Sequence, residues 1–346
     1  VRGAIGEMWS FVFMPLVFLA IYNLVEKAGI LNIMFLGISL ALLILAHNLT
    51  AIIFVPIAVI FFLVLIISKK EKIKIVSGFI GSLLFGFCLS AYYWLPAILE
   101  KRFIQVNTPF NPFDHFPFIK QLIFSSWGYG ASVWGPTDEI SFQIGIINLI
   151  IVLIALLILF LRKKNLENKK LLVFFLGLFF IAGFLMNIRS WFLWQLIPLG
   201  DYLQFPWRLL MITTFSTAFL LGFTGKYLPL VLSISAVLLT FNYFKPAKIM
   251  PVGDDYYLNR FFVNRTVKGM REFPSKEYSN YSEDYLPLTI WTSQRPKALP
   301  KNKVETDFES LDYQEITPVN FQAVVNSDKS TNVYFHNYYF PGWKAY

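Results

Sequence analysis

Charge and cysteine are both scarce in this sequence, and each scarcity excludes a class of protein. Only 15% of the 346 residues are charged, whereas soluble domains carry about 25%. The single cysteine, Cys88, lies in an apolar run, so no disulfide framework or cysteine-based zinc cluster can form within the chain. The apolar residues make up 56% of the chain and are clustered. This pattern favours a membrane protein over a soluble one.

Several nucleotide and metal motifs are also missing. The sequence has no phosphate-binding loop of the Walker type, no dinucleotide glycine fingerprint and no zinc-protease motif. The net charge is +9, and residues 1–244 hold 17 Lys+Arg against 9 Asp+Glu. This excess lies in short loops between apolar runs, where it reports membrane topology rather than nucleic-acid binding. We therefore expect no nucleic-acid partner.

The apolar runs predict a polytopic α-helical membrane protein. Each run has about the length that crosses the hydrocarbon core of a bilayer. We expect eight spans, at about 8–24, 29–46, 50–68, 74–97, 144–161, 170–187, 207–224 and 227–244.

Basic loops predict the orientation of these spans. Segments 69–74 and 162–170 are rich in lysine and arginine, so both are expected on the cytoplasmic side. By parity, loops 98–143 and 188–206 and all residues after about 245 fall on the opposite side. We therefore expect a multi-pass protein of the plasma (inner) membrane with an extracytoplasmic C-terminal part.

Two kinds of segment follow from this division. The aromatic residues of loops 98–143 and 188–206 predict short helices in the membrane interface, and a plain aromatic belt is the alternative. Residues 245–346 alternate in polarity and predict a small β-rich domain after a transmembrane domain over 1–244. Within it we expect a strand over 315–325, with a bulge or edge at Pro318, and another strand over 332–340. The last residues are typical of a hairpin without its second strand, so a truncated domain is expected.

Candidate site residues lie just before the first span and in the turn between the second and third spans. Arg2 and Glu7 precede the first span and could bind a phosphate and a sugar hydroxyl, or act as acid and base. An acidic residue at a helix start is the alternative. His47 and Asn48 join two spans, where His47 could be a base, a metal ligand or a phosphate partner. A polar turn that caps two helices is the alternative.

Further candidates lie in the two long loops. Trp127 and Tyr129 are suited to stacking on sugar rings, and Asp138 and Glu139 to acting as a base or metal ligand. A helix N-cap is the alternative for Asp138.

The segment Gln204-Phe205-Pro206-Trp207-Arg208 leads into the seventh expected span. Pro206 suits a helix start, and a cation such as Arg208 in the first turn opposes the helix dipole. We expect an anion to compensate, such as a ligand phosphate. An arginine that reaches to the membrane interface is the alternative.

Six short motifs together resemble a family. The chain is similar to the bacterial membrane proteins labelled "pyruvoyl-tetrahydropterin synthase-related", and through them to the GT-C glycosyltransferase superfamily and to YfhO-like membrane proteins. The resemblance covers nearly all of the chain and rests on residues 2–7, 46–51, 91–97, 126–130, 141–145 and 204–208, with 339–344 in the C-terminal part. It implies a GT-C-like fold and an enzyme that takes a sugar from a polyprenyl-phosphate carrier.

The leading hypothesis is an inverting glycosyltransferase. Glu7, Asp138 and Glu139 are the candidate proton acceptors, and Arg208 or Arg2 would hold the lipid phosphate. His47, Asn48, Trp127, Tyr129 and Gln204 complete the expected binding site. The expected partners are membrane lipid, a lipid-linked sugar donor and a glycan or protein acceptor, and a divalent metal ion is left open as cofactor. A transporter (flippase) of lipid-linked glycan and an envelope-assembly protein are the alternatives.

Overall fold

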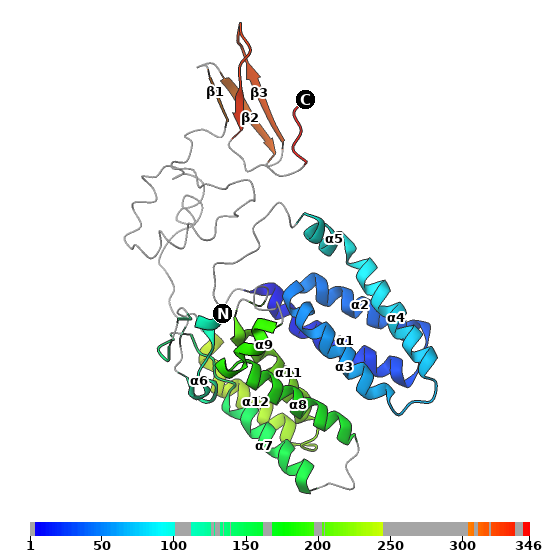
Figure 1. Cartoon of the computed structure of the whole chain (residues 1–346). Helices are drawn as coiled ribbons and strands as arrows, with labels where there is room; N and C mark the ends of the chain where they lie inside the picture. Colours follow the sequence, from blue (N-terminus) through cyan, green and yellow to red (C-terminus); the bar gives the residue numbers. More distant parts are fainter. Residues whose placement is uncertain are drawn as a thin grey trace. The chain divides into compact units, whose positions relative to one another are not determined.

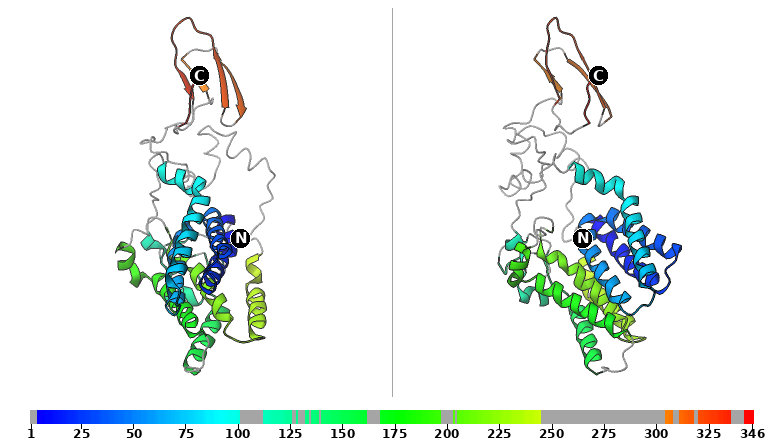
Figure 2. Two further views of the ribbon diagram at one scale, coloured as in Figure 1. Left: turned by 90° about the vertical axis from the view of Figure 1, so that its right-hand side faces the viewer. Right: turned by 45° about the vertical axis from the view of Figure 1, so that its right-hand side comes forward.

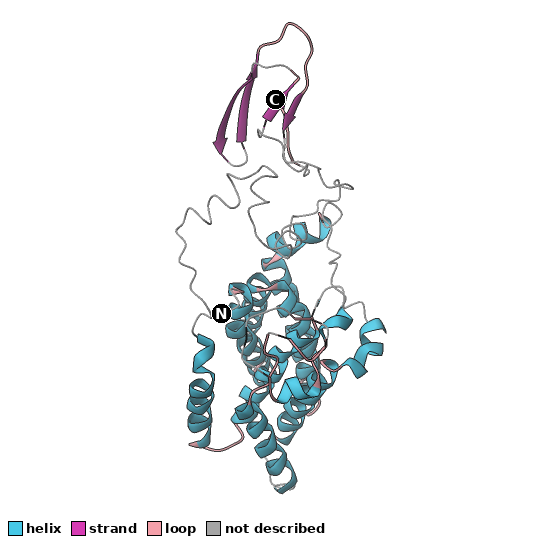
Figure 3. Cartoon of the chain, turned by 90° about the vertical axis from the view of Figure 1, so that its left-hand side faces the viewer, coloured by secondary structure: helices cyan, strands magenta, loops and turns pink. Residues whose placement is uncertain are grey.

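The computed structural model divides the chain into two compact units. The first contains Val1–Pro96 and Asn107–Lys248, and the second contains Ala97–Val106 and Ile249–Tyr346. Helices make up the first unit and strands appear only in the second (Figures 1 and 3). The structure describes residues 4–100, 112–125, 128, 132–133, 135–138, 140–161, 168–196, 203, 205–244, 304–307, 311–317, 320–335 and 342–346.

The longer helices are apolar, and several short helices lie between them in the sequence. In chain order they are α1 (Ile5–Glu26), α2 (Ile30–Ala46), α3 (Asn48–Ile66), α4 (Lys72–Leu89), α5 (Ala91–Leu99), η2 (Pro112–His115), α6 (Ile119–Ile123), α7 (Ile146–Leu161), α8 (Lys169–Leu185), η3 (Ile188–Ser190), α9 (Trp191–Leu196), η4 (Pro206–Leu209), α11 (Leu210–Leu221), α12 (Leu228–Thr240) and η5 (Phe241–Phe244).

The expected count of eight spans is not supported. All eight apolar segments contain helix, but within the described residues only α1, α3 and α4 are each long and apolar enough to cross a membrane. A fourth span results if α8 and Ile188–Leu196, bent by 91°, count as one. The bilayer core needs about 20 helical residues, whereas α2 has 17, α7 has 16 and α12 has 13. These helices end where polar residues or glycine interrupt the apolar run.

The bend after α8 has a local cause. The Ser190 hydroxyl and the Trp194 indole N–H both donate to the Leu185 carbonyl oxygen, at 3.0 Å each. The Asn187 side chain accepts from the Arg189 N–H at 3.1 Å and starts η3. Side-chain donors therefore bond to a carbonyl oxygen at the end of α8, which the N–H of a further helical turn would otherwise do. The long loops do contain short helices, and their place in a membrane interface stays a prediction.

The four N-terminal helices pack through small residues. Helix α2 contacts both α1 and α4. On α4, Gly78, Ser82 and Gly86 are buried, and a Cβ atom added to Gly86 would lie 2.7 Å from the Gly37 carbonyl oxygen of α2. Such a spacing lets two helix backbones approach closely, which is how helices associate in an apolar solvent.

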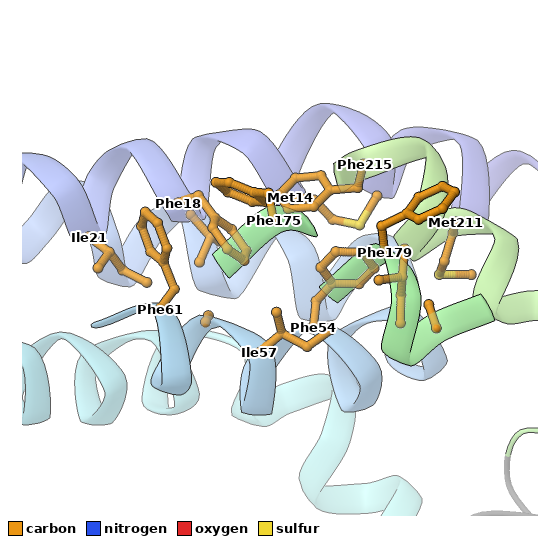
Figure 4. Packing of buried hydrophobic residues seen from close by; sticks show 14 of the residues in the cluster. Met14, Phe18, Ile21, Phe54, Ile57, Phe61, Phe175, Phe179, Met211 and Phe215 are labelled. Atoms are coloured by element: carbon orange, nitrogen blue, oxygen red, sulfur yellow. The ribbon is translucent and has the colours of Figure 1, made fainter. Parts of the chain in front are cut away.

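A cluster of phenylalanines joins these helices to α8 and α11. Phe18 of α1 is 1% exposed and lies 4.8 Å from Phe61 of α3 and 4.7 Å from Phe215 of α11, between ring centroids. Phe175 of α8 stacks on Phe219 at 4.4 Å. The side chains of Phe18, Phe61, Phe175 and Phe215 point into one shared core (Figure 4). Helices α7, α8 and α11 lie side by side (Figures 1 and 2).

The helical unit has two chemically different ends. The Ser10 hydroxyl of α1 lies 3.3 Å from the Thr50 hydroxyl of α3, so the starts of these two helices lie together. Phe54 of α3 lies 5.1 Å from Phe215 of α11, and the later Phe61 lies 4.8 Å from Phe18, whose ring is 6.1 Å from the later Phe219. Helix α11 therefore runs in the same direction as α3, and η4, which precedes α11, lies at the same end. Because η2 contacts η4, His115 lies there too. We call this end, which holds His47 and His115, the histidine end.

The opposite end carries a salt bridge between the end of α1 and the turn before α4. The Lys69 ammonium lies 2.8 Å from the Glu26 carboxylate. The expected basic loop at 69–74 and the acidic end of the first helix therefore meet at this end of the unit. Which membrane face each end occupies stays a prediction.

The second unit contains two antiparallel strand pairs among its described residues. Strand β1 (Val304–Thr306) pairs with β4 (Val333–Phe335), and β2 (Leu311–Thr317) pairs with β3 (Asn320–Val325). The expected single strand over 315–325 is therefore wrong, because Thr317 pairs with Asn320 across a hairpin. Strand β2 ends at Thr317, and the next residue in the sequence is a proline, which has no N–H to donate to a ladder.

Candidate functional site

A buried chain of hydroxyl groups links α1 to the start of α3. The Ser10 hydroxyl donates to the Glu7 carbonyl oxygen at 2.6 Å and lies 3.3 Å from the Thr50 hydroxyl. The Thr50 hydroxyl lies 2.7 Å from His47 Nδ1. Ser10 and Thr50 are both 0% exposed. This chain therefore connects the backbone of Glu7 to the side chain of His47, through two residues that the sequence pattern did not single out.

His47 is the N-cap of α3. Its Nδ1 accepts the Thr50 N–H at 3.2 Å, so in this arrangement the ring proton belongs on Nε2. Asn48 is exposed, and its side-chain oxygen accepts the Leu49 N–H at 2.7 Å. The expected capping turn is thus present. The predicted binding role of the two residues is compatible with it and stays a prediction.

Glu7 lies in the first turn of α1, close to the α2–α3 turn. A Cβ atom on the neighbouring Gly6 would overlap the Ala46 carbonyl oxygen and approach the His47 ring to 3.9 Å. Glycine at this position therefore lets the start of α1 approach the end of α2. The start of α1, which carries Glu7, therefore lies beside His47, and a shared site of the two residues stays a prediction.

Asp138 holds a loop in place. One of its carboxylate oxygens accepts the Gln121 amide N–H at 2.8 Å, and the other accepts the Val133 N–H at 2.8 Å. Gln121 is 7% exposed, and its own oxygen accepts the Phe118 N–H. The carboxylate therefore ties the loop before α7 to α6 rather than capping a helix, and its predicted role as a base stays a prediction.

His115 is a half-buried group that the sequence analysis did not select. Its Nδ1 lies 3.0 Å from the Ser132 hydroxyl, and its ring meets the Phe205 ring edge-on at 4.9 Å and 87°. Burial lowers the pKa of His115 below its ordinary value of 6.5, while Asp114 and Asp138 act in the opposite direction. The sequence feature that could have identified His115 is its position next to Asp114 in a long loop rich in aromatic residues.

Arg208 stands in η4, as the Pro206 signal predicts. Its guanidinium lies 5.5 Å from the centre of the Phe205 ring, and Phe205 stacks on buried Trp207 at 5.0 Å. The ring face gives the cation one favourable contact at a helix start, where the dipole opposes positive charge. Arg208 and His115 therefore share one aromatic neighbour, Phe205.

A pocket of about 320 Å³ opens between α7 and α12. Apolar side chains make up most of its wall, and Ser141, Asn148 and Thr240 add polar atoms. Asn148 is held by the Thr217 hydroxyl at 2.9 Å and by its own bond to the Ile144 carbonyl oxygen. The remaining predicted site residues lie outside the described residues; they are Arg2, Trp127, Tyr129, Glu139 and Gln204.

The stability of the folded chain is expected to fall as the pH drops below about 6.5, because of His115. The unfolded chain takes up this proton more readily than the folded one, so the contribution is complete above the unfolded pKa and is lost below it. Melting temperatures in detergent, measured from about pH 8 to about pH 5, should fall less for His115→Gln than for wild type. Equal pH dependence in the two proteins would contradict this.

The described residues do not form a metal site. No three His, Cys, Asp or Glu side chains in that part of the chain lie close enough together to hold an ion. Asp138, a predicted metal ligand, therefore belongs to no such group among the described residues. Glu139 lies outside the described residues.

Comparisons with known proteins assign this chain to no family. Comparison with protein-family profiles, with curated proteins and with solved structures finds no match for the chain. The resemblance to GT-C-like membrane proteins therefore stays a prediction that rests on short motifs.

Proposed function

We propose that this chain is a membrane glycosyltransferase that moves a sugar from a polyprenyl-phosphate donor to a glycan or protein acceptor outside the plasma membrane. The observation that carries the proposal is the gathering of Arg208, Glu7, His47 and His115 at one end of the helical unit. A guanidinium binds phosphate, and carboxylates and imidazoles move protons. These are the groups that sugar transfer from a phosphate requires.

Arg208 is the proposed phosphate ligand. Its guanidinium is fixed over Phe205, so little side-chain freedom would be lost on binding. The pocket between α7 and α12 is suited to an isoprenoid chain, because its wall is mostly apolar. Its polar rim begins at Ser141, whose hydroxyl lies 2.8 Å from that of Ser125.

The alternative of a flippase predicts charged side chains along a path through the bundle. Among the described residues, all buried polar side chains are neutral; they are Ser10, Ser39, Thr50, Ser82, Ser90, Gln121, Asn187, Ser190, Thr213, Ser216 and Thr217. Transfer at the histidine end needs no such path and is therefore the function we favour.

The test is sugar transfer by the full-length protein in liposomes that contain polyprenyl-phosphate sugars and an envelope glycan extract. Arg208→Gln is expected to lower kcat/KM for the donor about tenfold to a hundredfold, since a hydrogen bond to a charged group contributes about 1.5–3 kcal/mol. Arg189→Gln is the matched control, because Arg189 is an exposed arginine in η3.

Three outcomes separate the possibilities. Equal loss in both variants, or none in Arg208→Gln, contradicts the role of Arg208. An absence of transfer from every donor contradicts the proposed function. Movement of the intact lipid-linked sugar across the bilayer without transfer supports the flippase instead.

A further inference from the structure

The segment after α8 can meet a membrane in three ways. Ile188–Leu196, which contains η3 and α9, is bent by 91° from α8. It could complete a broken span, dip into the bilayer and return, or lie flat in the membrane plane. At 1.5 Å per residue a helix of this length covers about 14 Å, whereas the hydrocarbon core is about 30 Å thick. The segment is therefore too short to cross a bilayer alone.

Charged residues indicate where α8 enters and leaves the bilayer. Lys169 and Lys170 are exposed at its start, and Arg189 is exposed just after its end. Residues 171–188 between them contain no charged side chain, and an uncharged apolar stretch of about this length is enough to span. An exposed arginine is costly within the hydrocarbon, so the bend belongs at the headgroup layer. This location argues against a segment that dips into the bilayer.

The 91° bend then turns Ile188–Leu196 into the membrane plane. Membrane helices tilt by about 20° on average, and α8 contacts α11 and the candidate span α3. A segment perpendicular to α8 therefore changes little in depth along its length. Two hydrogen bonds fix the bend, because the Ser190 hydroxyl and the Trp194 indole N–H both donate to the Leu185 carbonyl oxygen at 3.0 Å.

This segment has one side that faces the protein and one apolar side that is exposed. Ser190 and Trp194 are buried, whereas Phe192 is 55% exposed and Leu196 is 75% exposed. Each pair is four residues apart and so shares one face of a helix. Because a turn contains 3.6 residues, the two pairs lie on opposite sides. Helices with such an apolar side lie in membrane interfaces, with that side inserted by about 5–10 Å.

We infer that Ile188–Leu196 lies flat in the membrane interface, with Phe192 and Leu196 inserted among the lipid chains. The inference goes beyond the proposed function and does not depend on it, since no step of sugar transfer enters the argument. Lipid is the partner that we assign to the exposed apolar side, because the segment follows a membrane helix directly and turns at its headgroup end.

The side that faces the protein connects this segment to the loop that carries His115. Trp191 meets Phe113 edge-on at 5.3 Å between ring centroids, and Trp194 meets Phe116 edge-on at 5.6 Å. Phe113 belongs to η2, which ends at His115. A segment that is inserted on one side and packed against η2 on the other sets the depth of η2. The histidine end therefore lies at the headgroup layer.

Paired cysteine labels test this orientation. A bimane fluorophore is attached to Phe192→Cys or to Leu196→Cys in the full-length protein in liposomes, with Cys88→Ser to remove the exposed native thiol. Phospholipids brominated at different positions along their chains then report the depth of each label. Two labels on a flat segment have the same shallow depth. On a segment that crosses or dips they differ by about 6 Å, the rise of four helical residues.

Phe180→Cys and Phe184→Cys on α8 are the matched controls. Both side chains are exposed, at 51% and 46%, and they too are four residues apart. Because α8 crosses the bilayer in this arrangement, their labels should differ in depth by about 6 Å. The label at position 184 should be the shallower one, since it lies closer to the bend.

Equal shallow depths at positions 192 and 196, with a gradient between 180 and 184, are the expected result. Three results at 192 and 196 overturn the inference. A depth difference of about 6 Å means a broken span or a segment that dips. Quenching by aqueous iodide in place of brominated lipid means a segment in water, and shielding from both quenchers means a protein partner or a second copy. Equal depths at 180 and 184 also overturn it, because α8 would then not cross.

Discussion

Replacing Phe18 by alanine is expected to lower the free energy of unfolding of the helical unit by about 3–5 kcal/mol, the usual effect of removing a buried aromatic ring. Phe18 is 1% exposed. Its ring lies within 4.8 Å of the Phe61 and Phe215 rings, between centroids. Removing it opens a cavity where α1, α3 and α11 meet, and the loss of dispersion contacts remains even in an apolar solvent.

The measurement is denaturation of the purified protein in mixed micelles, followed by circular dichroism. Phe11→Ala is the matched control, because Phe11 lies on the same helix and is 40% exposed. It should change the free energy of unfolding by well under half as much. A similar loss in both variants would mean that the shared core does not hold these helices together.

Replacing Gly86 by alanine is expected to separate α2 from α4. The added Cβ would lie 2.7 Å from the Gly37 carbonyl oxygen, and 3.1 Å from a methyl carbon of Leu40. Backbone cannot move aside as a side chain can, so we expect a cost of about 1–3 kcal/mol, typical of overpacking. The same denaturation assay measures it.

Gly81→Ala is the control for this substitution. Gly81 lies on α4 too, and no atom lies within 4 Å of an added Cβ there. Alanine favours helix over glycine by about 1 kcal/mol, so this variant should be as stable as wild type or more so. If Gly86→Ala behaves in the same way, the close approach of α2 and α4 is not what holds them.

The helical segments were predictable because apolar runs are local features of a sequence. Each of the eight expected segments contains helix. Their ends were not predictable, because they depend on particular side chains. The 207–224 segment, for example, begins as η4 and continues as α11 with only 12 residues. The count of spans failed at this point, since a few residues decide whether a helix reaches across a bilayer.

The candidate site was predictable in part. Glu7, His47, Asp138 and Arg208 stand out in a chain with little charge. The structure places Glu7, His47 and Arg208 at one end of the helical unit, and Asp138 near His115 at that end. Ser10 and Thr50 could not be found, because serine and threonine are common in apolar helices and their bond joins residues forty positions apart. His115 was missed because its partners, Ser132 and Phe205, are distant in sequence.

The sequence by itself determined the class of this protein: apolar helices that indicate a membrane protein, and a short β-rich part at the C-terminus. Composition and periodicity are sufficient for that, because they reflect the solvent that each residue meets. Only the tertiary structure decided which polar groups meet. The hydroxyl chain of Ser10 and Thr50, and the shared contact of His115 and Arg208 with Phe205, depend on packing between distant segments. No local pattern encodes such contacts.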